Sequence, residues 1–95
     1  MVSFDDYVLD VLMLDLVGHD HSPAAFVVFL LLWRESVARR RANVRISHQG
    51  MSAATGLSKS AVQVAIRHLL RRKLIVQRRE AETAVPEYEI LRHWR

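Results

Sequence analysis

Five side chains between residues 59 and 67 have the types and the spacing needed to read the edges of nucleic-acid bases. Glutamine pairs with adenine, arginine pairs with guanine, and an apolar group contacts the thymine methyl. Lysine and serine add further hydrogen-bonding groups. The chemistry that this set suggests is recognition by contact, without bond making or breaking. The five candidates for base contacts are Lys59, Ser60, Gln63, Val64 and Arg67.

A second set of polar and basic side chains flanks the first and has the chemistry to bind phosphate. Contacts to phosphate fix the position and orientation of a protein on a duplex, whereas base contacts supply specificity. His48 and His68 are also expected to contact phosphate instead of transferring protons. The candidates for backbone contacts are Ser47, Gln49, Arg71, Arg78 and Arg79.

Two helices joined by a tight turn, over residues 46–74, are expected to position these side chains. Ser47 and Ser58 can each cap a helix, because a serine hydroxyl accepts an N–H that is otherwise unpaired at a helix start. Gly56 suits the left-handed conformation that ends helices. At about 100° per residue, the second helix has an apolar face opposite its polar face. The apolar face comprises Val62, Ala65, Ile66, Leu69 and Leu70.

Residues 46–58, ISHQGMSAATGLS, resemble the helix-turn-helix of bacterial winged-helix DNA-binding domains. Those domains commonly read I-S-x-x-x-L-A-x-x-T-G-L-S, then K-S-x-V-x-x-A-I-x-x-L and a leucine-isoleucine strand. The resemblance covers residues 22–95 and implies a three-helix core with a β-hairpin wing. It also implies a recognition helix at 59–72 that enters the major groove of double-stranded DNA. The chain departs from the pattern at Gly50, Met51, Ser52 and Lys73.

An additional amphipathic helix is expected over residues 3–17. Ser3 and Asp6 have the spacing of a capping box, and Gly18 is expected to end the helix. The helix must bury its apolar stripe on its own domain or on a second copy of the chain. We expect a homodimer joined through the N-terminal extension, residues 1–21. The stripe comprises Phe4, Tyr7, Val8, Val11 and Leu12, extended by Leu14, with Leu16 as a further candidate.

The remaining elements are a long helix and a small sheet. Ser22 and Pro23 begin a helix expected to reach about Arg41. Its residues 24–33 are apolar on every side and should be buried on most of their circumference. The three arginines at the end of this helix, residues 39–41, either interact favourably with the helix dipole or contact phosphate. Residues 43–46, 74–80 and 87–91 are expected to be strands, with a wing loop at 81–86. The loop carries glutamate and no basic residue, so Arg78 and Arg79 at its base should matter more than its tip.

The two parts of the chain carry opposite charge. All five aspartates and none of the 14 basic residues lie in residues 1–33, whereas residues 34–95 carry every Lys and Arg against five glutamates. A basic part combined with an acidic part suggests one face for a polyanion and another face turned away from it.

Several classes of protein are disfavoured. The sequence contains no cysteine, phosphate-binding glycine loop or H-E-x-x-H motif, so we expect neither an enzyme nor a bound cofactor. His19-Asp20-His21 invites a metal hypothesis, but adjacent loop residues seldom supply the three or four converging ligands of a stable site. No metal is therefore expected. The N-terminus lacks the basic region of a signal peptide, and the apolar run at 24–33 is about half the roughly 20 residues of a membrane helix. A soluble, cytoplasmic protein is expected.

The sequence thus predicts one mainly α-helical domain over residues 1–95, a winged helix-turn-helix with a small β wing and an extra N-terminal helix. Its expected function is sequence-specific binding of double-stranded DNA as a homodimeric transcriptional regulator. Two alternatives remain open. One is a DNA-binding domain of the kind found in plasmid and phage replication initiators. The other is a winged helix that serves as a protein–protein interaction module.

Overall fold

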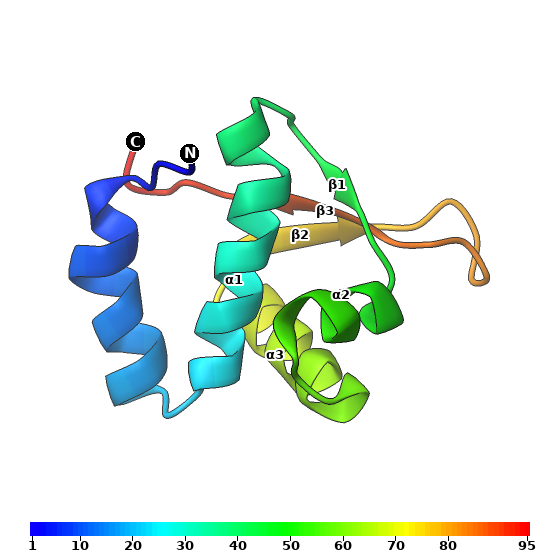
Figure 1. Ribbon diagram of the computed structural model, residues 1–95, viewed down its shortest axis with the longest axis horizontal. Helices are drawn as coiled ribbons and strands as arrows, with labels where there is room; N and C mark the ends of the chain where they lie inside the picture. The colour runs from blue at the N-terminus through cyan, green and yellow to red at the C-terminus, as the bar shows by residue number, and fades with distance from the viewer.

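The computed structural model describes residues 1–95 and begins with a helix that lies alongside α1 (Figure 1). This N-terminal helix, residues 6–19, contains the segments η1 (Val8–Leu12) and η2 (Leu14–His19). It is followed by α1 (Pro23–Glu35), the short 3-10 turn η3 (Val37–Arg39) and β1 (Val44–Arg45). The chain continues through α2 (His48–Thr55), α3 (Lys59–Arg71), β2 (Ile75–Arg78) and β3 (Glu87–Ile90). No helix combines the length and the apolar character needed to cross a bilayer.

The predicted turn between α2 and α3 is confirmed in its details. The Ser47 hydroxyl accepts the Gly50 N–H at 3.0 Å, and the Ser58 hydroxyl accepts the Ala61 N–H at 3.1 Å. Gly56 ends α2 with φ 82°, in the left-handed region that a residue with a Cβ adopts only at a cost. A further hydrogen bond joins the Ser52 hydroxyl to the Leu57 carbonyl at 2.6 Å. These local contacts fix the start of α3 relative to α2.

The three strands form one antiparallel sheet in the order β1-β3-β2. Val44 pairs with Tyr88 and Ile75 pairs with Ile90. The hairpin therefore has the predicted partner strand, although β2 and β3 are shorter than expected. The loop between them projects away from the helices at one end of the molecule (Figure 1).

One hydrophobic core joins all the elements, and α1 contributes most to it. Seven of the thirteen residues of α1 are buried, including Phe29 and Trp33. From α3 the core receives Val62, Ala65, Ile66 and Leu69, as the sequence predicted, while Leu70 is only partly buried.

Helix α1 ends at Glu35, six residues before the predicted end. The hydroxyl of the buried Ser36 donates to the Leu32 carbonyl at 2.6 Å, and the chain then tightens into η3. Arg40 adopts a left-handed conformation with φ 57°, which prevents the helix from continuing. Arg39 pairs with Glu35 at 3.2 Å.

The N-terminal helix differs from its prediction in four respects. It begins at residue 6, and its hydrogen bonds are of the π type, such as Asp20 N–H to the Asp15 carbonyl at 2.7 Å. The Ser3 capping box is absent, and the Ser3 carbonyl instead accepts the Trp33 Nε1–H at 2.8 Å. Leu16 is fully buried, whereas Leu14 is 69% exposed.

Part of the apolar stripe of the N-terminal helix is covered within one chain. Val8, Leu12 and Leu16 are at most 3% exposed and belong to the common core. The C-terminal tail also holds this region, because the Asp5 carboxylate accepts the Trp94 Nε1–H at 3.0 Å. The Tyr7 ring stacks on Trp94 with a centroid distance of 4.5 Å.

Candidate nucleic-acid interface

The exposed face of α3 carries all five candidates for base contacts. Each of these side chains is exposed, and so is the neighbouring Arg71. The valine among them, Val64, is 53% exposed although apolar side chains of similar size fill the buried face of the same helix. The result is a mixed surface of cationic, amide, hydroxyl and methyl groups along one side of α3.

A hollow of about 260 Å³ lies between the start of α2, the start of α3 and the β2–β3 loop. It brings four predicted contact residues together: Ser47 and Gln49 from α2, Lys59 from α3, and Arg79 from the end of β2. Its remaining wall is His48 and loop residues 83–86. Residues that lie up to 32 positions apart in the sequence thus form one polar pocket that continues the exposed face of α3.

The electrostatic character of this hollow is positive. The pKa of His48 is lowered from its ordinary value, first by partial burial and then by the positive charges of Arg79 and Lys59. The His48 Nε2 atom lies 3.4 Å from the hydroxyl of Tyr88, whose pKa burial raises above its ordinary value. Tyr88 therefore remains a neutral phenol and brings no negative charge to the site.

Arg78 is the last residue of β2, and Arg79 follows it outside the strand. Both line a second hollow, of about 220 Å³, but only Arg79 also lines the hollow beside α2 and α3. Arg78 lies on the outer face of the sheet, where its guanidinium contacts the Glu89 carboxylate at 3.0 Å, and Arg45 contacts Glu87 nearby at 3.1 Å. The structure therefore does not bring Arg78 into the hollow beside α2 and α3.

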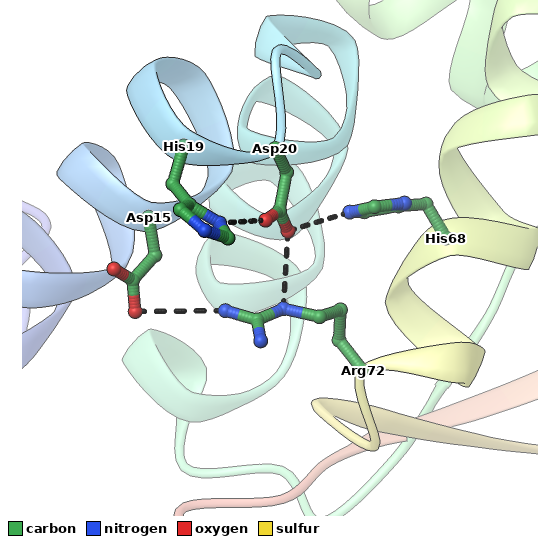
Figure 2. A network of polar contacts seen from close by, with 5 residues as sticks. All are labelled: Asp15, His19, Asp20, His68 and Arg72. Atoms are coloured by element: carbon green, nitrogen blue, oxygen red, sulfur yellow. Dashed lines mark hydrogen bonds and ion pairs between the residues drawn. The ribbon is translucent and has the colours of Figure 1, made fainter.

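His68 is directed inward, to a polar cluster at the end of the N-terminal helix (Figure 2). Its Nε2 donates to the Asp20 carboxylate at 2.7 Å, and Arg72 contacts the same oxygen at 3.1 Å. His19 donates to the other Asp20 oxygen at 2.8 Å, and Arg72 also contacts Asp15 at 3.5 Å. His68 is thus occupied within the protein, contrary to the prediction of a phosphate contact.

Sequence patterns do not indicate the Asp20 cluster, because its members lie up to 57 positions apart. The only sequence feature that indicates the cluster is Asp20 itself, which lies between His19 and His21 before α1. Hydrogen bonds from His19 and His68 lower the pKa of the Asp20 carboxyl from its ordinary value, against the opposing effect of burial and with the added attraction of Arg72. Asp20 is therefore an ionised anchor that ties the N-terminal helix to α3.

Comparisons of the chain with protein-family models, with curated proteins and with solved structures gave no match.

Proposed function

We propose that this chain is a winged helix-turn-helix protein that binds double-stranded DNA sequence-specifically and regulates transcription. The order α1-β1-α2-α3-β2-β3 and the sheet order β1-β3-β2 support this architecture, because a winged helix combines three helices with a hairpin and a short partner strand. The observation that carries the proposal is the exposed polar face of α3, which continues into a positive hollow beside the wing.

In the proposed complex, α3 lies in the major groove with its N-terminal end toward the bases. Gln63 pairs with adenine, Arg67 with guanine, and Val64 packs on a thymine methyl. Phosphates on either side of the groove are bound by Arg71 and by the hollow. Arg79 is better placed for this role than Arg78, because Arg78 already pairs with Glu89 on the outer face of the sheet.

Substitution of the arginines of α3 tests the assigned face. Arg67→Ala should weaken binding to a preferred duplex by about 1–3 kcal/mol and relax the preference at one base pair. Arg71→Ala should weaken binding to all duplexes and reduce the salt dependence by about one counterion. Arg78→Ala is the matched control and should bind almost as the parent does. Fluorescence titration with random and selected duplexes measures all three; parent-like binding by both α3 variants would show that another face is used.

A homodimer completes the proposal, because a two-fold pair of recognition helices about 34 Å apart would read a palindromic site. Burial of Val8, Leu12 and Leu16 within one chain leaves other apolar side chains of the N-terminal helix in an exposed row. It comprises Leu9, Met13, Leu14 and Val17, which are 38–69% exposed. Exposed apolar patches of this kind mark partner sites.

Sedimentation equilibrium at micromolar concentration tests the dimer. The parent is expected to show twice the mass of one chain, and Leu14→Lys should give the mass of a monomer because it places a charge in the exposed row. Lys73→Glu, in the turn after α3, is the control for a change of surface charge and should leave the mass unchanged. A monomeric parent would remove the dimer from the proposal and leave DNA binding to be judged separately.

The same exposed row favours one alternative of a different class, a winged helix that binds another protein. The glutamates of the wing loop support the same alternative, because their negative charge opposes contact with DNA. Binding of the parent to random duplex at two salt concentrations separates the two classes. A DNA-binding protein loses affinity steeply as salt rises, whereas a protein-interaction module shows no appreciable DNA binding at either concentration.

A further inference from the structure

The hollow beside the wing contains one group whose charge can change near neutral pH. His48 is the first residue of α2 and faces Lys59 from α3, Arg79 from the end of β2, and Tyr88 from β3. The charges that act on it are both positive. The neighbouring Glu87 is engaged with Arg45 on the outer face of the sheet. In the free protein, the positive charges of Lys59 and Arg79 therefore oppose protonation of His48.

A phosphate bound in the hollow favours the protonated form of His48. Its negative charge, placed between Lys59 and Arg79, offsets their repulsion of an imidazolium and adds an acceptor for a second ring N–H. The hydrogen-bond partners present allow both states. In the neutral ring, the Tyr88 hydroxyl donates to the Nε2 lone pair and Nδ1 carries the proton. In the imidazolium, Nε2–H donates to the Tyr88 oxygen and Nδ1–H remains available to an anion.

We propose that His48 is a protonation-dependent phosphate contact, which takes up one proton from solvent when the hollow binds the backbone of double-stranded DNA. This inference rests on the proposed function and adds a regulatory property to the same site: affinity for DNA increases as the pH falls. The sign follows from linkage, because a group whose pKa is higher in the complex than in the free protein favours the complex at low pH. A single group can change the dissociation constant by at most about tenfold per pH unit.

Two substitutions of opposite character test the assignment. His48→Gln keeps hydrogen-bonding capacity without charge, and it should bind DNA with a weak affinity that is independent of pH. His48→Lys keeps a permanent charge, and it should bind at pH 8 more tightly than the parent, again without pH dependence. The matched control is His21→Asn, because His21 is exposed, lies outside the hollow and has a positive φ that asparagine tolerates. This control should keep the pH dependence of the parent.

The measurements are duplex-DNA titrations from pH 6 to pH 8 at constant ionic strength and calorimetric titrations at pH 7 in two buffers of different ionisation enthalpy. The parent should bind more tightly at pH 6 and absorb a fraction of one proton per chain, and His48→Gln should absorb none. Thermal melting confirms that each variant is folded. DNA binding that is equal at pH 6 and pH 8, or pH-dependent binding that survives in His48→Gln, would overturn the inference alone. Absence of DNA binding by the parent at every pH would overturn the proposed function together with it.

Discussion

Replacement of Leu16 by alanine is expected to lower the free energy of unfolding by about 2–5 kcal/mol, the usual cost of removing a buried leucine side chain. Leu16 is fully buried in the core beside Val8 and Leu12, at the contact between the N-terminal helix and α1. The loss includes the transfer of the side chain to water and the cavity that remains. Urea denaturation followed by circular dichroism measures the change.

Leu14→Ala is a closely matched control, because it makes the same chemical change two residues away on the same helix. Leu14 is 69% exposed within one chain, so its removal should change the stability of the monomer, at low protein concentration, by no more than about 0.5 kcal/mol. Both variants are measured at two protein concentrations, since a dimer makes stability depend on concentration. Equal destabilisation by the two variants at low concentration would show that the N-terminal helix does not dock on α1 through Leu16.

The comparison between Leu14 and Leu16 also shows where sequence patterns fail. An α-helical period places Leu14 beside Val11 but nearly opposite Leu12, whereas Leu16 follows Leu12 by four residues and shares its face. Val8, Leu12 and Leu16 have this spacing of four and are buried, while Val11 is only partly buried and Leu14 is exposed. The pattern alone allows either leucine, and packing against α1 decides that the buried face is centred on Leu12.

At the turn between α2 and α3 the predictions that depend on local chemistry were confirmed, whereas the predicted Ser3 capping box was wrong. Ser47 and Ser58 cap their helices, and Gly56 has a positive φ, because each of these features is decided within about four residues of the chain. The apolar face of α3 was predictable for a similar reason, since a regular α-helix of 13 residues keeps its period. A short segment with strong capping signals and regular periodicity therefore specifies much of its own structure.

The candidate site was only partly predictable, because it depends on contacts between distant segments. The exposure of Lys59 and Arg67 follows from the period of α3, but the meeting of Lys59 with Arg79 in one hollow requires the β2–β3 loop to lie beside the starts of α2 and α3. Arg78 and Arg79 are adjacent in the sequence, yet only Arg79, which follows the end of β2, lines this hollow. Nothing near His68 in the sequence indicates that its side chain faces inward, because its partner Asp20 lies 48 positions away.

Asp20→Asn is expected to cost about 1.5–3 kcal/mol of stability at pH 7, the usual range for hydrogen bonds to a charged group. The Asp20 side chain is only 9% exposed and accepts from His19, His68 and Arg72 (Figure 2). Asparagine has the same size, but its amide nitrogen would face one of these donors and cannot accept from it. Asp10→Asn, at an exposed position of the same helix, is the control and should change stability by less than about 0.5 kcal/mol.

The pH dependence of this loss identifies ionised Asp20 as its cause. The folded pKa of Asp20 lies below its ordinary value of 3.8, so the stability that the carboxylate contributes is fully present above that value. It is lost as the pH falls through the lower, folded pKa, where the carboxylate becomes protonated. The difference in stability between parent and Asp20→Asn should therefore still be present at pH 5 and should shrink below pH 4. A difference that is undiminished at pH 2.5 in urea denaturation would assign the cost to packing around the new amide and not to the charge of Asp20.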